Sequence, residues 1–407
     1  MNSQTSFMHL HRRQIAGVVL LTYLLNPLLV FGQVIVNAGT PSDGRRAYVD
    51  QTQSGVTKIN IATPNAAGLS HNSYQQFDVP KAGVVLNNGA TNSNTRIAGW
   101  VEGNPNLKSG QEARLILNEV VGASASQLQG YIEVAGQKAG VIVANERGVS
   151  CNGCGFINTE QVTLSTGRPV IGADGALQQL RVQGGQVSIG ELGLQAADSR
   201  VDILSQYVNV QGPVHAERLR VVSGANAVDM ATGKANTIEA KDKSTPAGLD
   251  VSALGGMYAN QITLQATGEG VGVRMDGKLI SAGQLAIAAD GTLVNRGQIQ
   301  ADGAIELKAR RIEQSGQTQG AAAVVVDALQ TVHSGQTQGQ SLQLSGQSLD
   351  NSGALKALTA GLTLTLQEQL NKSGRRSALI EMRAPVDGVV LEVARKSRGS
   401  VVREGET

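Results

Sequence analysis

The stretch SGQTQGAAAVVVDALQTVHSGQTQG, residues 315–339, decides the fold, because its first six residues return unchanged 19 positions later. The segment between the two copies contains alternating apolar residues, a pattern typical of short β-strands. Apolar pairs with one residue between them recur at similar distances along the chain. A period of about 20 residues, built from strands and glycine-rich turns, indicates a solenoid. The pairs are Val187/Ile189, Val208/Val210, Ile262/Leu264, Leu285/Ile287, Ile305/Leu307, Val324/Val326, Leu342/Leu344 and Leu362/Leu364.

A parallel β-helix fits this period better than a leucine-rich repeat, which demands a denser leucine pattern with Asn or Cys at a fixed position. We therefore expect an all-β chain folded as a right-handed parallel β-helix with short β-hairpin excursions. Right-handed crossovers are the rule for parallel strands, and Gly and Asn suit the corners. About 18 coils at ~4.8 Å each would give a rod roughly 85 Å long. The polar region 225–250 breaks the pattern and is expected to leave the rod as a loop or hairpin.

The composition gives little support to an enzyme or to a nucleic-acid partner. The net charge is +2 over 407 residues, of which 16% are charged and 3% aromatic. A near-neutral chain has no electrostatic reason to bind nucleic acid or an acidic membrane. We expect no catalytic activity and no cofactor, and we keep a β-helical polysaccharide-cleaving or polysaccharide-binding protein as the alternative function. Trp100, the single tryptophan, is expected to pack rather than to bind a sugar. The acidic residues fall singly at expected turns, among them Asp198, Asp202, Asp290 and Asp302.

The N-terminus has the pattern of a secretory signal. A basic patch at 9–13 precedes an apolar run at 15–31, and small or polar residues follow. Pro27 within this run makes it a poor permanent membrane span. We expect a signal peptide at 1–32, cleaved after Gly32, with a short membrane anchor as the alternative. The mature chain is then expected to leave the cytoplasm for the periplasm and beyond.

Cys151 and Cys154 are the only cysteines, and they enclose two residues. In an oxidising compartment such a pair more often closes a disulfide than holds a metal. A zinc site needs two further ligands, but no second cysteine pair exists and the histidines are scattered, so we expect no metal site. A thioredoxin-like redox centre needs a helix start and a βαβ context, neither of which is predicted. A local disulfide is therefore the expectation, with two free, small core residues as the alternative.

Several stretches of the first half resemble the secretion domain at the N-terminus of filamentous-haemagglutinin-like exoproteins, the exported partners of two-partner secretion. The resemblance implies a β-helical secretion domain at 33–270, and the coils at 271–376 resemble haemagglutinin repeats. The stretches are INIATPNAAGLSHNSYQQFDVPKAGVVLNN at 59–88, GNPNLKSG at 103–110, ARLILNEV at 113–120, GYIEVAGQKAGVIVAN at 130–145 and ANERGVSCNGCGFINT at 144–159.

One hallmark motif of that family is present unchanged. Asn-Pro-Asn is a turn builder, because Pro fixes φ at the second turn position and Asn side chains close Asx turns. These residues could shape a loop only, whereas the resemblance implies that they contribute to recognition by the transporter. We expect the same role for the region of His71 and Asn72. The motif residues are Asn104, Pro105, Asn106 and Leu107.

The second hallmark, Asn-Pro-Asn-Gly-Ile in the family, is altered here. Asn145 and Gly148 keep its first and fourth residues, but Glu146 and Arg147 replace the Pro and the second Asn. We expect that the turn of the family cannot form in the same way at these two positions. Asn145 and Gly148 are nevertheless included among the expected recognition residues.

The resemblance also implies a partner and a location. The partner is an outer-membrane β-barrel transporter whose periplasmic recognition domains pair with strand edges of the secretion domain, as in type V secretion. The chain would then fold coil by coil outside the cell, at the cell surface or in the medium. Rods of this family serve adhesion, or carry a toxic end to neighbouring cells in contact-dependent inhibition. A host or neighbouring cell surface is therefore a second expected partner.

The last 31 residues change in style. APVDG at 384–388 and the segment 399–406 resemble the two ends of the lipoyl-like half-motif of membrane fusion proteins. We expect an incomplete, adaptor-like β tail at 377–407, which could arise from a gene fusion or a frameshift, and the alternative is a coincidental β-hairpin.

Overall fold

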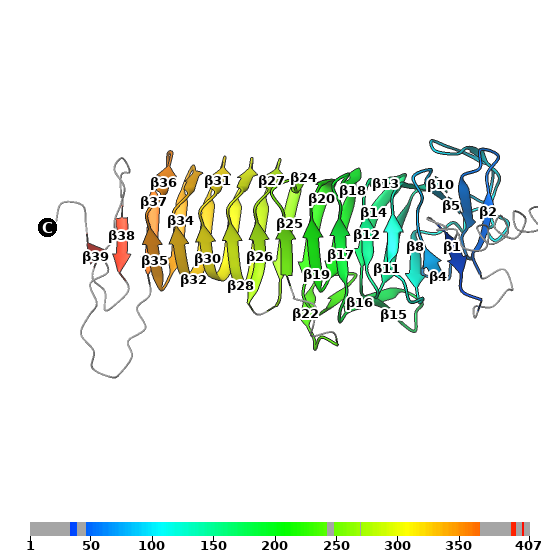
Figure 1. Ribbon diagram of the computed structural model, residues 1–407, viewed down its shortest axis with the longest axis horizontal. Coiled ribbons are helices and arrows are strands. Elements are labelled where there is room, and N and C mark those ends of the chain that lie inside the picture. The colour runs from blue at the N-terminus through cyan, green and yellow to red at the C-terminus, as the bar shows by residue number, and fades with distance from the viewer. Residues whose placement is uncertain are drawn as a thin grey trace, which may run out of the picture.

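The structure is a computed structural model that describes residues 33–38, 46–241, 248–268, 270–366, 392–395 and 401–402. The expected signal peptide at 1–32 lies outside these residues. Every regular helix or strand element among them is a β-strand, and no described helix has the length and apolar character needed to cross a membrane. The strands stack coil upon coil into one rod (Figure 1), which confirms the expected β-solenoid.

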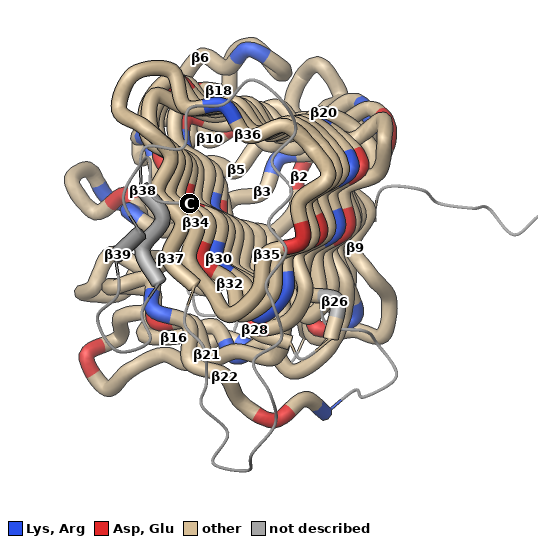
Figure 2. Tube along the Cα trace, turned by 90° about the vertical axis from the view of Figure 1, so that its left-hand side faces the viewer, with Lys and Arg blue, Asp and Glu red and all other residues tan. Residues whose placement is uncertain are grey.

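A full coil contributes one strand to each of three columns, and the strands of a column pair in parallel. Among the described residues, the first and the last coil contribute strands to columns A and B only. Figure 2 looks along the rod and shows successive coils lying over one another. Column A contains β3 (Thr57–Asn60), β5 (Val84–Asn88), β10 (Tyr131–Gly136), β13 (Cys154–Ile157), the first parts of β18 (Leu194–Ser205) and β20 (Pro213–Ser223), β24 (Gly256–Ala259), β27 (Lys278–Ser281), β29 (Gln298–Ala301), β31 (Gln317–Gly320), β33 (Gln336–Gly339) and β36 (Ala354–Ala357).

The other two columns complete the coils. Column B contains β4 (Leu69–Phe77), β8 (Leu115–Val120), β11 (Ala139–Asn145), β14 (Thr159–Ser165), the second parts of β18 and β20, β25 (Gln261–Ala266), the first parts of β28 (Leu285–Asn295), β30 (Ile305–Gln314) and β32 (Val324–His333), β34 (Leu342–Gly346) and β37 (Leu362–Leu366). Column C contains β9 (Ser126–Leu128), β12 (Val149–Cys151), β17 (Gln186–Ile189), β19 (Tyr207–Val210), β23 (Gly248–Val251), β26 (Val271–Met275), the second parts of β28, β30 and β32, and β35 (Ser348–Asn351).

The apolar pairs predicted from the sequence form the core of the rod. Val187 lies beside Val208 in column C, and Ile305 lies beside Val324 in column B. These four side chains are at most 1% exposed. A single coil cannot bury its own apolar face, so the stack of coils stabilises each member.

The rod has about twelve coils rather than the expected 18. At ~4.8 Å per coil, twelve coils span roughly 53 Å between the first and the last. The estimate from the period was too high because three segments leave the rod and the N-terminal strands form a cap. The expected division at residue 270 stays a prediction.

An antiparallel cap covers the first coil. β1 (Val34–Val36) pairs with β4, and β2 (Tyr48–Gln51) pairs with β3, both antiparallel. These two strands occupy edges of columns A and B that would otherwise be free at this end of the rod. An open strand edge is a template for pairing with another chain.

The described excursions are β-hairpins that cover outer faces of the rod. The hairpin of β6 (Ser93–Thr95) and β7 (Gly99–Val101) lies between β5 and β8 in the chain and packs on column A. The strands β15 (Arg168–Ile171), β16 (Leu177–Val182), β21 (Asn226–Asp229) and β22 (Ala235–Thr237) form an antiparallel side sheet. Apolar residues of this sheet bury outward-facing residues of column B, including Leu117, Ile142 and Leu204. Of the region 225–250, residues 225–241 leave the rod as expected, whereas 248–250 already belong to β23 in column C.

The tail is described only at two short strands. β38 (Glu392–Arg395) pairs in parallel with β37, and β39 (Val401–Val402) pairs with β38 in the antiparallel sense. Residues 384–388 lie outside the described part of the chain. The resemblance of the tail to membrane fusion proteins therefore stays a prediction.

The repeated segment predicts that one coil can be removed. Deleting residues 316–334 joins Ser315 to Gly335, and β33 can then stack on β29 because β31 and β33 occupy equivalent positions. Since each coil contacts its neighbours only, we expect the free energy of unfolding to change by less than ~2 kcal/mol. Denaturant unfolding of the full chain measures this. Deletion of residues 316–325, about half a coil, is the control and should unfold the later coils, and equal behaviour of the two deletions would contradict the repeat.

A buried polar ladder follows the corner between columns C and A. Asn295 Nδ2 donates to Gln314 Oε1 at 2.9 Å. One coil further, His333 is 2% exposed, with Nδ1 2.7 Å from Asn351 Oδ1 and Nε2 2.9 Å from Thr337 Oγ1. The amide oxygen of Asn351 can only accept, so Nδ1 carries the proton of the neutral ring. Burial lowers the pKa of His333 below its ordinary value of 6.5.

This lowered pKa predicts that the later coils lose stability in acid. Below pH ~6.5 the unfolded chain takes up a proton at this histidine that the folded chain does not, so the free energy of unfolding falls as the pH decreases towards the folded pKa. His333→Gln removes the titration and should remove this part of the pH dependence. Urea midpoints of both proteins at pH 5.5 and 7.5 measure the difference. An equal acid loss in both proteins would assign the effect to other groups.

Candidate functional site

The Asn-Pro-Asn-Leu motif forms a closed turn directly after the β6–β7 hairpin. The Asn106 backbone N–H donates to Asn104 Oδ1 at 2.9 Å, which is an Asx turn. The Leu107 N–H donates to the Asn104 carbonyl at 3.0 Å. Pro105 stands at the second turn position, where its fixed φ suits the bend. Leu107 then enters the main core, where it is 7% exposed.

Asn104 fixes this turn to the first two coils. Its Nδ2 donates to the carbonyls of Ile61 at 3.0 Å and Asn87 at 2.9 Å. These carbonyls follow or belong to neighbouring strands of column A. Asn106 adds a second bond to Ile61, at 3.0 Å. One buried amide thus joins the excursion to two coils.

The altered second motif has the same hydrogen-bond pattern as the first, so the expectation that the turn cannot form in the same way at Glu146 and Arg147 was wrong. The Arg147 N–H donates to Asn145 Oδ1 at 2.9 Å, and the Gly148 N–H donates to the Asn145 carbonyl at 3.0 Å. Asn145 Nδ2 bonds to Ser124 and Ser126, each at 3.0 Å. The turn depends on the Asn at its first position and on Gly148, whose φ is +119°. Glu and Arg can adopt the two central conformations without Pro.

His71 and Asn72 lie on β4 and face opposite sides. Asn72 is buried, with Oδ1 accepting from the Ala62 N–H at 2.8 Å and Nδ2 donating to the Leu117 carbonyl at 3.3 Å. His71 points outward, and its Nε2 lies 2.7 Å from Glu119 Oε2 on β8. Asn72 therefore joins the first two coils from inside, whereas His71 is accessible.

Most of the expected recognition residues are buried in the folded rod. Asn104, Leu107, Asn145 and Asn72 are buried, as is Gly148. Of the others, Pro105 and His71 are exposed and Asn106 is half-buried. A partner that meets the folded domain can therefore contact only a minority of these residues.

Two side chains that hold the segment between β5 and β8, with its β6–β7 hairpin, to the rod were not predicted from the sequence. Asn88 Oδ1 accepts from the Ala113 N–H at 2.7 Å, where the chain returns to column B. Glu133 on β10 is 4% exposed, and its two carboxylate oxygens accept from the backbone N–H groups of Arg96 and Ile97 at 2.7 and 2.9 Å. The sequence signal that could have identified them is a polar residue at the end of an apolar strand, as for Asn88, or within one, as for Glu133.

Trp100 is 58% exposed, so the expectation that it packs was wrong. It lies on β7, where side chains alternate between two faces. Val101 takes the inner face, beside Val85 and Ala135. Trp100 consequently points away from the rod.

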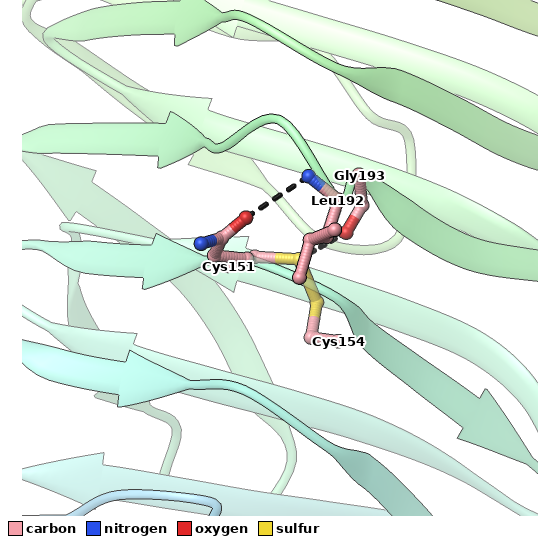
Figure 3. Close-up of a disulfide and its surroundings, with 5 residues drawn as sticks. Cys151, Cys154, Leu192 and Gly193 are labelled. Carbon is pink, nitrogen blue, oxygen red and sulfur yellow. Dashed lines mark hydrogen bonds between the residues drawn. A yellow bond between two sulfur atoms is a disulfide. The ribbon is translucent and has the colours of Figure 1, made fainter. Parts of the chain in front are cut away.

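The two cysteines are joined by a disulfide at the corner between β12 and β13 (Figure 3), with an S–S distance of 1.99 Å. Both are fully buried. Within the described part of the chain, no group of three or more His, Cys, Asp or Glu side chains could hold a metal ion.

Comparisons with known proteins agree on one kind of domain. The family model of the TPS secretion domain matches residues 32–307. The crystal structure of the filamentous hemagglutinin secretion domain is similar, with a TM-score of 0.57 and 31% identity over 80% of this chain and 99% of that chain.

Two curated proteins illustrate the sequence relatives. The 16S rRNA endonuclease CdiA of Enterobacter cloacae is 42% identical over 300 residues, which are 73% of this chain and 9% of that protein. The tRNA nuclease CdiA-2 of Burkholderia pseudomallei is 40% identical over 292 residues, which are 71% of this chain and 9% of that protein. The chain thus spans only a small part of the length of these relatives.

Proposed function

Because this chain belongs to the TPS secretion domain family, we propose that residues 33–270 are the segment that an outer-membrane β-barrel transporter recognises for two-partner secretion. The observation that carries this proposal is the likeness of 80% of the chain to the filamentous hemagglutinin secretion domain at 31% identity. The alternative of a polysaccharide-cleaving or polysaccharide-binding protein is not retained, because the matched family is a secretion domain.

The transporter binds the chain before the first coils close. Buried residues of the two motif turns, Asn104 and Asn145, are out of reach once the rod has formed. The antiparallel cap also occupies strand edges of the first coil. Strand addition by the periplasmic domains of the transporter requires open edges, so these domains bind an extended chain. Asn104 and Asn145 are no longer accessible to the transporter once their side chains form hydrogen bonds within the rod.

Folding outside the cell follows from the same geometry. Asn104 closes a turn against the first two coils, so it can act as soon as both have emerged. Each later coil adds to the exposed end of its predecessor. A growing rod that cannot re-enter the transporter would favour outward movement without nucleotide hydrolysis.

The role of the whole protein follows by analogy with its relatives. The names of the CdiA proteins describe nucleases and toxins, and the matched segment is a small part of each. We propose that the present segment exports and begins a β-helical stalk of such a surface-exposed carrier, with neighbouring or host cells as the target. No nuclease activity is assigned to the segment itself.

Binding by the isolated periplasmic domains of the cognate transporter tests the proposal. The full chain is diluted from denaturant onto these immobilised domains, and a second sample is allowed to fold first. We expect the freshly diluted chain to bind and the folded chain to bind at least ~10-fold less. Equal binding by both samples would contradict recognition before folding. Failure of both samples to bind would contradict recognition by these domains.

A further inference from the structure

The Cys151–Cys154 disulfide lies between coils that cover it on both sides. Cys151 on β12 pairs with Leu128 of the preceding coil and with Ile189 of the following coil. Cys154 on β13 pairs with Leu194 of the following coil. Both cysteines are 0% exposed. The following coil, residues 186–196, is thus a cover over the two sulfur atoms.

The disulfide ring also carries the turn of that coil. Leu192 N–H donates to Asn152 Oδ1 at 3.0 Å (Figure 3), and Gly190 N–H donates to the Cys151 carbonyl at 2.8 Å. Gly153 N–H donates to the Gly193 carbonyl at 3.0 Å. All residues of the ring except Cys154 therefore bond to the turn at 190–193. Because the disulfide fixes the conformation of the ring, these hydrogen-bonding groups are already in place when the turn at 190–193 forms.

Chemical access to the sulfur atoms exists only before the cover closes. Thiol–disulfide exchange requires a thiolate to attack a sulfur atom of the partner disulfide and form a mixed disulfide. The folded coils leave no room for such a partner at either sulfur. Oxidation therefore has to come before residues 186–196 add to the rod.

We infer that the Cys151–Cys154 bond is made in the unfolded chain, and that the closed ring then templates the coil at 186–196. The two thiols lose two protons and two electrons as their S–S bond forms. A disulfide-carrying oxidant, a protein or glutathione, takes them up and becomes two thiols. Under the proposed function, on which this placement rests, the reaction occurs in the periplasm, and the small ring passes the transporter without joining distant parts of the chain.

The reduced chain offers a direct comparison, because it has a way to fold. Cys151 Sγ lies 3.4 Å from the Gly193 carbonyl oxygen. In the disulfide this is a contact without a proton, but a free Cys151 thiol could donate there. We expect the reduced chain to fold, more slowly than the oxidised chain, and to hold both thiols beneath the cover.

The test measures oxidation of the full chain by oxidised glutathione, before and after folding in the reduced state. Alkylation followed by mass spectrometry counts the remaining thiols. We expect closure in the folded chain to be at least ~100-fold slower than in the unfolded chain, since the cover has to open first. Failure of the reduced chain to fold at all would also support the inference. Equal closure rates in the two states would overturn it.

A matched control measures whether folding changes the reaction of an exposed thiol with oxidised glutathione. Ser109 is exposed in the loop after the first motif. In a Cys151→Ser, Cys154→Ser background, Ser109→Cys should form its mixed disulfide with glutathione at similar rates in folded and unfolded chain. If the reaction of this control also slowed strongly on folding, slow closure of the native pair would no longer show that the pair is buried. Alkylation of the folded, reduced native chain would then decide. Thiols protected from alkylation would support the inference, and reactive thiols would overturn it.

A second arm places the reaction in the cell. In a host that lacks its periplasmic thiol oxidase, the chain released by the transporter should carry two thiols and keep them in medium containing oxidised glutathione. Closure of these thiols after release would overturn the inference. If the chain is not released even from a host that has both the oxidase and the transporter, the proposed function fails, while the measurement on purified chain still decides the order of oxidation and folding.

Discussion

Replacement of Asn104 by alanine is expected to lower the free energy of unfolding of the N-terminal coils by about 3 kcal/mol. The change removes the two bonds from Nδ2 to the carbonyls of Ile61 and Asn87 and the Asx bond from Asn106. Each bond lost at a buried polar group costs about 1–3 kcal/mol, and the losses in one network are not additive. Denaturant unfolding of the full chain, followed by circular dichroism, measures the effect.

Pro105→Ala is the matched control for that change. Pro105 belongs to the same turn but is exposed, so its replacement should cost less than ~1 kcal/mol, mainly through the unfolded state. If the two variants were equally stable, the buried amide of Asn104 would not be what holds the excursion to the first two coils.

Tyr74→Ala is expected to have the largest effect, a loss of about 3–5 kcal/mol. Tyr74 on β4 is fully buried, and its ring centre lies 5.0 Å from that of Phe77. Its hydroxyl donates to Asn118 Oδ1 at 3.1 Å. Burial raises the pKa of Tyr74, so the phenol stays neutral and keeps its proton for this bond. Removal of the ring leaves a cavity beneath the cap of the rod.

Tyr74→Phe separates the hydroxyl from the ring. The ring and its contacts remain, while Asn118 loses one donor, so we expect a loss of about 1–2 kcal/mol. Urea unfolding of both variants gives the comparison. A cost below 1 kcal/mol for Tyr74→Ala would mean that the N-terminal coils do not unfold together with this core.

The sequence allowed the stack of columns B and C to be predicted, because the alternation of apolar residues survives in the later coils. Ile305 and Val324 stand 19 positions apart, and the coil places them side by side. The side sheet could not be predicted. It pairs β16 with β21, and these strands become neighbours only when the coils that lie between them in the chain have folded.

The site was only partly predictable for the same reason. Asn104 was identified as a turn residue, but its bonds to Ile61 and Asn87 depend on coils that lie 43 and 17 positions away. The turn at Asn145 was judged from its missing Pro, although the geometry depends on the first and fourth positions. Trp100 was misplaced because the excursion that turns it outward has no signal in the period of the rod.

Release of the full chain from a Gram-negative host tests the central claim most directly. The chain is expressed with and without the cognate outer-membrane transporter, and its amount is measured in the medium and in the periplasm. The proposed function predicts release with the transporter and retention in the periplasm without it. Equal release in both hosts, or retention in both while the transporter is present and intact, would contradict export by two-partner secretion.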